Sequence, residues 1–417
     1  MDRFVVEGPC RLEGEVAISG AKNAALPCLA ASLLTAEPVR LTNLPDVADV
    51  RTMQRLLQHI GVFLSASPGE AVAEARDIGS ADAPYDLVKK MRASVLVLGP
   101  LLARCGRVRV SLPGGCAIGV RPINLHLEAL RRMGAEVTLE HGYVEARAAR
   151  LSGAEVSFGT VTVTGTENVL LAAVLASGRT VISNAAREPE VEDLARLLRA
   201  MGARISGEGT GTITVEGVPK LHAASHDVVP DRIEAGTYAI AAAATRGDVT
   251  VRGCRPGHLE ALIGNLEAAG ARLDSAEDSL RVRAGTALSA RDVTTSPYPG
   301  FPTDLQAQWM ALATTLDGVS TITETIFENR FHHVAELARM GAHIRLEGRR
   351  AAVAGPAPLT GANLMASDLR ASAALVIAAL VAHGETVIDR VYHLDRGFDR
   401  MEEKIRALGG NVRRVQP

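Results

Sequence analysis

The chain has 417 residues and a nearly balanced charge, with 45 Lys and Arg against 47 Asp and Glu and a formal net charge of −2 at pH 7. This balance, together with an aromatic content of only 3%, gives no indication of a basic, base-stacking surface that binds nucleic acid. The length predicts two or three domains, each large enough for its own hydrophobic core.

One pattern of apolar residues recurs about every 70 residues along the chain. In each copy a very apolar helix is followed by a β-branched stretch, an amphipathic helix that ends on glycine, and two short strands. Glycine directly after the last periodic apolar residue is typical of a helix C-terminus, because that position favours the left-handed backbone conformation. The six closing glycines are Gly61, Gly134, Gly202, Gly270, Gly341 and Gly409.

The repeat predicts six subdomain-sized units of α/β structure. Because the very apolar helices need burial on nearly all sides, we expect the helices inside and the sheets outside. The polar stretch 222–230 separates the third unit from the fourth. We therefore expect one domain over residues 21–229 and a second over residues 230–417, to which residues 1–20 add a strand.

Residues 112–126 form a glycine-rich loop around one cysteine. Its three glycines tolerate backbone conformations that other residues resist, so the loop can present the thiol of Cys116 to open space. Pro122 suits the first turn of a helix that runs to about Met133, with Arg121 at its anion-attracting N-terminus. These features predict a site for an anionic reactant, although a free cysteine can equally be a small apolar filler.

Charged residues open several of the apolar helices. Helix capping or the helix dipole, worth ~1 kcal/mol, accounts for the acidic ones, including Asp304. It does not account for cations, because the dipole disfavours positive charge at an N-terminus. A salt bridge explains any one of these cations, but an anionic ligand explains the set better. The cations are Lys22, Arg92 and Arg370, with Arg330 and Arg396 in similar positions.

The cysteines, the possible metal ligands and the apolar runs indicate where the protein acts and which cofactors it uses. The five cysteines are scattered without a CxxC pair, which predicts no disulfide framework, no common zinc module and a reducing cytoplasm. No His, Cys or carboxylate cluster has metal-ligand spacing, so we expect no metal and no cofactor. Residues 1–4 lack the order of a signal peptide, and the most apolar run, 371–382, is shorter than the ~20 residues that span a bilayer. We expect a cytoplasmic monomer without membrane insertion.

Seven short motifs, spread over essentially the whole chain, together resemble the UDP-N-acetylglucosamine 1-carboxyvinyltransferases, a family of enolpyruvyl transferases. The resemblance implies an inside-out α/β barrel in two domains of three βαβαββ units. It also implies transfer of enolpyruvate from phosphoenolpyruvate to the 3′-hydroxyl of UDP-N-acetylglucosamine with release of phosphate, the first committed step of peptidoglycan synthesis. The motifs span residues 19–27, 91–94, 113–126, 299–304, 327–331, 367–370 and 394–397.

The same resemblance implies roles for individual residues. Cys116 resembles the proton donor to C3 of the enolpyruvyl group, and Asp304 the candidate base for the 3′-hydroxyl. Lys22, Arg121 and Arg396 are expected to hold the phosphate and carboxylate of phosphoenolpyruvate. The implied substrate contacts also include Asn23, Arg92, Pro122, Ile123, Asn124, Leu125, Asp304, Ile326, Arg330 and Arg370.

One departure and three alternatives stand beside this interpretation. The family's diphosphate segment often carries a lysine that residues 160–165 lack, so backbone N–H groups would have to serve there. A shikimate 3-phosphate enolpyruvyl transferase shares the fold and reaction type, but the Gly-Gly-Cys loop argues against it. A cysteine hydrolase using Cys116 and His126 lacks a third orienting group. A catalytically silent UDP-sugar-binding paralogue would be free to lose the catalytic residues that this chain retains.

Overall fold

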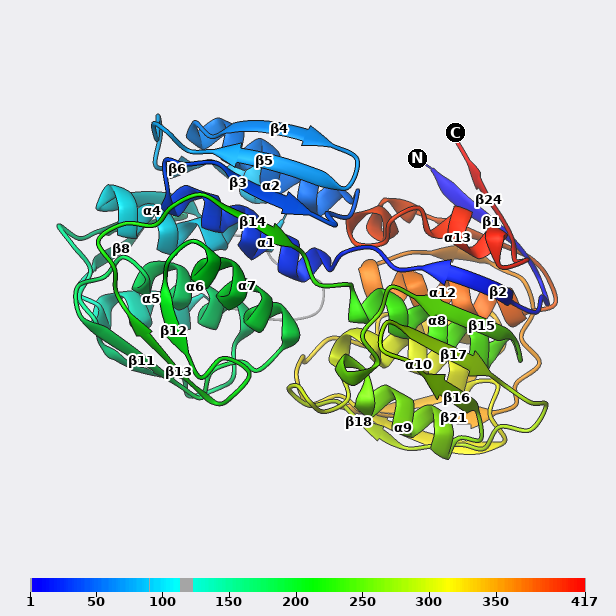
Figure 1. Cartoon of the computed structure of the whole chain (residues 1–417). Helices are drawn as coiled ribbons and strands as arrows, with labels where there is room; N and C mark the ends of the chain where they lie inside the picture. The colour runs from blue at the N-terminus through cyan, green and yellow to red at the C-terminus, as the bar shows by residue number, and fades with distance from the viewer. Residues whose placement is uncertain (1, 90, 113–122, 417) are drawn as a thin grey trace. The chain divides into compact units, whose positions relative to one another are not determined.

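The structure is a computed structural model that describes residues 2–89, 91–112 and 123–416. Within these ranges the chain forms six four-stranded sheets and divides into two compact units (Figure 1). The first unit comprises the described residues from 20 to 229, and the second comprises residues 2–19 together with 230–416.

All six sheets share one strand order. An edge strand runs parallel to its neighbour, which pairs antiparallel with the next strand, and the last two strands are also antiparallel. In five of the sheets the last two strands form a hairpin, whereas in the sixth they come from the two ends of the chain. The sheets of the first unit are β14 (Ala224–Asp227), β3 (Val39–Thr42), β5 (Glu70–Glu74) and β4 (Phe63–Ser67); β6 (Asp82–Ala83), β7 (Arg107–Ser111), β9 (Tyr143–Arg147) and β8 (Glu136–Glu140); and β10 (Glu155–Ser157), β11 (Arg179–Ser183), β13 (Thr212–Glu216) and β12 (Arg204–Ser206).

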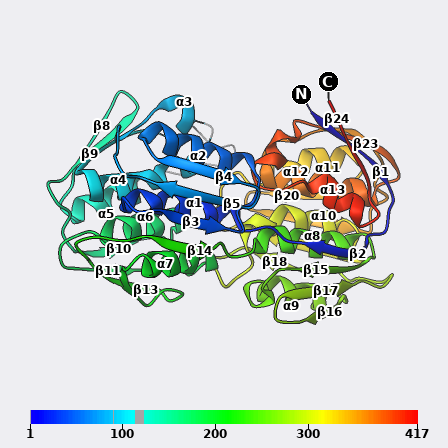
Figure 2. The same cartoon turned by 45° about the horizontal axis from the view of Figure 1, so that its top comes forward.

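The second unit repeats this arrangement, with β2 beside β15 (Figure 2). Its sheets are β2 (Glu13–Ala17), β15 (Asp248–Arg252), β17 (Ser279–Arg283) and β16 (Arg272–Ser275); β18 (Val293–Thr294), β19 (Gly318–Thr323), β21 (Arg350–Gly355) and β20 (His343–Glu347); and β22 (Asn363–Met365), β23 (Gly384–Asp389), β1 (Arg3–Gly8) and β24 (Asn411–Val415).

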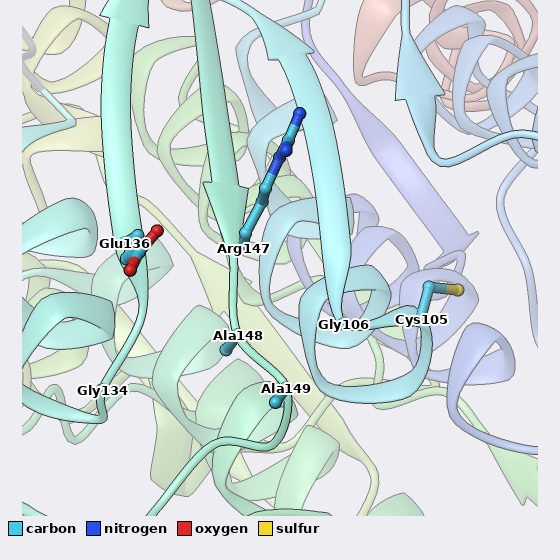
Figure 3. Close-up of a pocket in the computed structure, with 7 residues that line it drawn as sticks. All are labelled: Cys105, Gly106, Gly134, Glu136, Arg147, Ala148 and Ala149. Carbon is cyan, nitrogen blue, oxygen red and sulfur yellow. The ribbon is translucent and has the colours of Figure 1, made fainter.

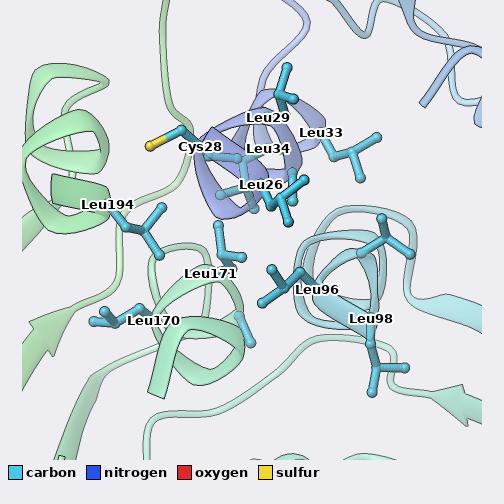
Figure 4. Close-up of a cluster of buried hydrophobic side chains, with 14 of the residues drawn as sticks. Leu26, Cys28, Leu29, Leu33, Leu34, Leu96, Leu98, Leu170, Leu171 and Leu194 are labelled. Carbon is cyan, nitrogen blue, oxygen red and sulfur yellow. The ribbon is translucent and has the colours of Figure 1, made fainter. Parts of the chain in front are cut away.

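Each unit is built around very apolar helices, and central strands of the surrounding sheets, such as β9 and β13, alternate buried residues with more exposed ones. In the first unit, leucines from these helices and their 3₁₀ extensions meet in one cluster (Figure 4). In the second unit the three apolar helices pack against one another. The expected arrangement of helices inside and sheets outside is confirmed. These inner helices are α1 (Lys22–Ala31), α4 (Leu98–Cys105) and α6 (Val163–Ala173), and α8 (Arg232–Ala244), α10 (Gln306–Ala313) and α12 (Leu369–Val381).

The six glycines predicted to end helices do so. Each follows an amphipathic helix within two residues and has a φ between +88° and +114°, where only glycine is unstrained. The helices are α2 (Ala48–Ile60), α5 (Asn124–Arg132), α7 (Pro189–Ala200), α9 (Glu260–Ala268), α11 (His333–Arg339) and α13 (Met401–Ala407). The short helical segments are η1 (Ser32–Leu34), α3 (Tyr85–Val88), η2 (Arg92–Val97), η3 (Pro256–His258), η4 (Thr303–Leu305) and η5 (Val391–Arg396).

The N-terminal segment contributes two strands to the second unit, where the sequence predicted one strand without a partner. β1 lies between β23 and β24, with Arg3 opposite Val415, and β2 pairs with β15. In the first unit, β14 completes the sheet of β3. The chain therefore passes from one unit to the other near residue 20 and again near residue 230. Among the described helices, none has the length and apolar character needed to span a membrane.

Candidate active site

Two arginines hold Asp304 in the second unit. The Oδ1 atom of Asp304 accepts a hydrogen bond from Nη2 of Arg330 at 2.6 Å, and Oδ2 accepts one from Nη2 of Arg370 at 2.9 Å. Both arginine side chains are 6% exposed, and the aspartate side chain is 26% exposed. One carboxylate thus joins two nearly buried guanidinium groups.

The arginines decide the charge state of Asp304. Burial alone would raise the pKa of this carboxyl group. The charges of Arg370 and Arg330, with the hydrogen bonds that they donate, outweigh burial and hold the pKa of Asp304 well below its usual range. The carboxylate is therefore ionised at neutral pH, and it can accept a proton only when its bonds to the arginines weaken.

Three separate elements supply these side chains. Asp304 lies within η4, just before α10; Arg330 precedes α11, and Arg370 lies in the first turn of α12. Of the two local explanations for Asp304, capping is wrong, because its side chain makes no capping hydrogen bond and Pro302 occupies the cap position. Asp304 does lie in the first turn of η4, where the helix dipole favours an acidic residue. Asp368 does cap α12, by accepting hydrogen bonds from the N–H groups of Arg370 and Ala371.

Glu324 is a buried carboxylate beside this group that sequence reasoning missed. Its Oε2 accepts a hydrogen bond from the hydroxyl of Thr303 at 2.8 Å, next to Asp304. Its Oε1 accepts bonds from the hydroxyl of Thr295 at 3.0 Å and from the N–H groups of Ile326 at 2.8 Å and Phe327 at 3.1 Å. Glu324 therefore ties the turn of Asp304 to the loop of Ile326. The available signal was an acidic residue directly after the strand-like stretch 319–323.

We predict that Glu324→Gln lowers the free energy of unfolding by about 1–3 kcal/mol, because an amide has one acceptor oxygen in place of two and lacks the charge that strengthens the four hydrogen bonds. Urea denaturation measures this difference. The matched control is Glu328→Gln in the same loop, whose side chain is 54% exposed and whose loss should change stability by less than about 0.5 kcal/mol. Equal effects of the two changes would contradict the positioning role of Glu324.

In the first unit, Lys22 opens α1 and forms an ion pair with Asp49. Nζ of Lys22 donates to Oδ2 of Asp49 at 3.2 Å, and the two side chains are 11% and 6% exposed. Asn23, the next residue of α1, is half-buried. An anion that binds Lys22 must therefore compete with an internal carboxylate.

His126 lies near the start of α5 and is fully engaged. Its Nδ1 lies 3.1 Å from Nδ2 of Asn168, and its Nε2 lies 3.3 Å from the hydroxyl of Thr164. Burial, assisted by the charge of Arg92, lowers the pKa of His126 to about 4. The ring is therefore neutral at pH 7 with both nitrogens occupied, which argues against its use as the base of a cysteine hydrolase.

A family model described as EPSP synthase (3-phosphoshikimate 1-carboxyvinyltransferase) matches residues 6–405. The chain belongs to this family of enolpyruvyl transferases. Two relatives are UDP-N-acetylglucosamine 1-carboxyvinyltransferases: one from Koribacter versatilis is 57% identical over 419 residues, and one from Acidobacterium capsulatum is 56% identical over 420. The alignments cover 100% of this chain and 97% and 96% of the relatives.

Solved structures of enolpyruvyl transferases have the same fold. The crystal structure of the enolpyruvyl transferase NikO from Streptomyces tendae matches with a TM-score of 0.90 at 26% identity, covering 100% of this chain and 99% of that one. An EPSP synthase from Acinetobacter baumannii matches with a TM-score of 0.76 at 19% identity over the full length of both chains, which shows the fold alone. The predicted inside-out α/β architecture is thereby confirmed.

The other residues expected from the enolpyruvyl transferase resemblance are divided between the units. Cys116, Arg121 and Pro122 lie outside the described residues. In the first unit, Arg92 begins η2, and Ile123, Asn124 and Leu125 lie at the start of α5; the predicted start of this helix at Pro122 is likewise outside the described ranges. In the second unit, half-buried Ile326 follows β19, and half-buried Arg396 ends η5.

An open pocket in the first unit lies apart from these residues (Figure 3). It is formed where β7 begins, where β8 begins and where β9 ends, and none of the expected enolpyruvyl transferase site residues lines it. Its lining comprises Cys105, Gly106, Gly134, Glu136, Arg147, Ala148 and Ala149.

Proposed function

We propose that this chain transfers the enolpyruvyl group of phosphoenolpyruvate to the 3′-hydroxyl of UDP-N-acetylglucosamine and releases inorganic phosphate, the first committed step of peptidoglycan synthesis. The observation that carries the proposal is the 57% identity, over the whole chain, to a relative named for this activity. The family model named for the shikimate 3-phosphate reaction supports the reaction type, and the relatives support the nucleotide sugar as acceptor.

The reaction proceeds by addition and elimination. In the addition, the 3′-oxygen of the sugar loses its proton and bonds to C2 of phosphoenolpyruvate, while C3 gains a proton from Cys116. In the elimination, C3 loses a proton and the bond between C2 and the phosphate oxygen breaks. Lys22, Arg121 and Arg396 hold the anionic groups and stabilise the charge that develops on the phosphate.

The ion pairs of Asp304 suggest how this base becomes available. Phosphoenolpyruvate carries a carboxylate and a phosphate, either of which can take a guanidinium fork from Arg330 or Arg370. When a substrate anion shares these cations, the pKa of Asp304 rises from its depressed value, and the carboxylate becomes able to accept the proton of the 3′-hydroxyl. In this proposal the substrate itself releases the base.

The proposed substrates are small anions, and the reaction itself calls on no metal or organic cofactor. The four described cysteines, Cys10, Cys28, Cys105 and Cys254, are free thiols, as in proteins of a reducing compartment. We therefore propose that the enzyme acts in the cytoplasm.

A phosphate-release assay with the purified protein tests the proposed function. We expect release that requires both phosphoenolpyruvate and UDP-N-acetylglucosamine, and a rate at least about tenfold lower when shikimate 3-phosphate replaces the nucleotide sugar. Faster release with shikimate 3-phosphate would assign the alternative reaction. Binding of the nucleotide sugar without any release of phosphate would identify a silent paralogue.

A further inference from the structure

Three side chains of different types converge inside the first unit, and none of them is among the proposed catalytic residues. Cys28 lies on α1, Asp193 on α7 and His226 on β14. Sγ of Cys28 lies 3.9 Å from Oδ2 of Asp193, and Nε2 of His226 lies 3.1 Å from the same oxygen. The three atoms all lie within 4.8 Å of one another. Figure 4 shows the sulfur of Cys28 directed towards the side of the cluster where Leu194 lies, the next residue after Asp193.

The imidazole and the carboxylate are close but do not form an aligned hydrogen bond. Nε2 of His226 has no hydrogen-bond partner among the described residues, although Oδ2 of Asp193 is 3.1 Å away. A nitrogen and a carboxylate oxygen 3.1 Å apart are also close enough to coordinate one common ion. The carboxylate is otherwise anchored, since Oδ1 accepts from Nη2 of Arg196 at 3.1 Å and Oδ2 accepts from the N–H of Val229 at 3.3 Å.

The surroundings of the three side chains are buried and include a further acidic residue. Cys28 is completely buried, and Asp193 is 1% exposed. Glu167 is also 1% exposed, and its Oε1 has no hydrogen-bond partner within the described ranges. Burial and the charges of Glu190 and Glu188 raise the pKa of Glu167 well above its usual value, which favours the neutral carboxyl. Arg196 is the cation that faces Asp193. A bound cation would favour loss of the proton of the Cys28 thiol.

We propose that Cys28, Asp193 and His226 form a binding site for a divalent transition-metal ion, with zinc as the favoured ion. Thiolate, imidazole and carboxylate are the three ligand types of protein zinc sites, with bonds of about 2.0–2.3 Å. Tetrahedral coordination at these lengths places the ligand atoms about 3.3–3.8 Å apart. The observed separations of 3.1 and 3.9 Å therefore require shifts of less than about 1 Å.

The proposed site would have one open coordination position, and His226 is its most exposed ligand. Three protein ligands leave the fourth position to water, and the His226 side chain, which is 10% exposed, marks the side from which water and metal enter. Binding replaces the thiol proton of Cys28, which leaves to solvent. Because α1, α7 and β14 each supply one ligand, the ion would join three elements that are distant in the sequence and would raise the thermal stability of the first unit.

Cobalt(II) titration of the full chain tests the site, because a cobalt–thiolate bond gives a charge-transfer absorption that other ligands do not. The titration uses a Cys116→Ser background, so that the proposed catalytic thiol cannot contribute. We expect one equivalent of Co²⁺ to produce the absorption, zinc to displace it, and saturating zinc to raise the melting temperature. The result is independent of the proposed function, since the readout is spectroscopic and the background already lacks the catalytic thiol.

Two pairs of variants make the test specific. Cys28→Ala should abolish the absorption, and His226→Gln should weaken cobalt binding at least about tenfold. The matched controls are Cys254→Ala, another buried cysteine, and His222→Gln, a histidine four residues before His226; both should bind like the parent. Circular dichroism checks that each variant is folded. If Cys28→Ala does not fold, His226→Gln, whose residue lies on an edge strand, still tests the site. The proposal would be overturned if the Cys116→Ser protein gave no absorption, or if the absorption persisted in the folded Cys28 or His226 variants.

Discussion

Asp304→Asn is expected to lower kcat by about 10²–10⁴-fold, while the affinity for UDP-N-acetylglucosamine changes by less than about tenfold. Asparagine is close in size to aspartate but cannot accept the proton of the 3′-hydroxyl. Steady-state kinetics with a phosphate readout give kcat, and calorimetry gives the affinity. Normal turnover by this variant would show that Asp304 is not the base.

The same change removes the partner of two nearly buried guanidinium groups, so stability must be measured alongside activity. Breaking a buried ion pair by removing one partner costs up to about 3–5 kcal/mol. Asp248→Asn is the matched control, because Asp248 accepts two hydrogen bonds from Arg281, each at 2.8 Å, on the exposed surface of the same unit. It should lose at most about 1 kcal/mol and keep its turnover. Phosphoenolpyruvate should restabilise the Asp304 variant more than the parent, since its anionic groups replace the missing carboxylate.

The pH dependence of this stabilisation follows from the direction of the pKa shift. The folded-state pKa of Asp304 is depressed by Arg370 and Arg330, against the opposing effect of burial. The ion pairs therefore contribute their full stability above the unfolded pKa of about 3.9, and this contribution is lost as the pH falls below that value towards the folded-state pKa. Assays near neutral pH examine the ionised form throughout.

Cys116→Ala is expected to reduce turnover by about 10²–10⁴-fold, the usual contribution of a general acid. Cys116→Asp should retain part of the activity, because a carboxylic acid can also deliver a proton to C3, yet it should resist the epoxide fosfomycin. In the parent protein, fosfomycin should label Cys116 faster than any other cysteine, which peptide mapping after a short exposure measures. Comparable labelling of several cysteines would contradict the prediction.

The environments of the other four cysteines support this selectivity. Burial raises the pKa of Cys10, Cys105 and Cys28, for the last with help from the charges of Asp193 and Glu167, and it raises the pKa of Cys254 to about 11. Because the thiolate is the nucleophile, these four thiols are poor targets near neutral pH.

The repeat and the helix ends could be predicted from the sequence because both depend on local patterns. The prediction that a glycine ends a helix used only the apolar pattern of that helix. The structure shows the expected left-handed backbone at all six glycines. The partners of the charged residues could not be predicted in this way. Lys22 meets Asp49 and Arg370 meets Asp304 through packing of separate elements, so sequence reasoning predicted cations without their carboxylates.

Glu324 and the Cys28 group show the same limit more strongly. Glu324 has no neighbour in the sequence that indicates four hydrogen bonds, and the residues at 28, 193 and 226 have none of the spacings by which metal ligands are recognised. Their proximity results from the strand order, which places β14 beside β3 although 181 residues separate the ends of the paired strands nearest in sequence. The capping alternative for Asp304 is contradicted, because its carboxylate bonds to Arg330 and Arg370 instead of to the local backbone.

The position of β1 has a consequence for how the chain is made. Both neighbours of this strand, β23 and β24, come from the last 34 residues of the chain, so during synthesis the first strand to emerge waits, unpaired, for the last to be translated. Because the two ends then lie in adjacent strands, a short linker between them and new termini near residue 230 would give a circular permutant. In that permutant each unit is one uninterrupted stretch of polypeptide and the two are joined by a single crossing, so the units could be cut apart and their separate folding followed.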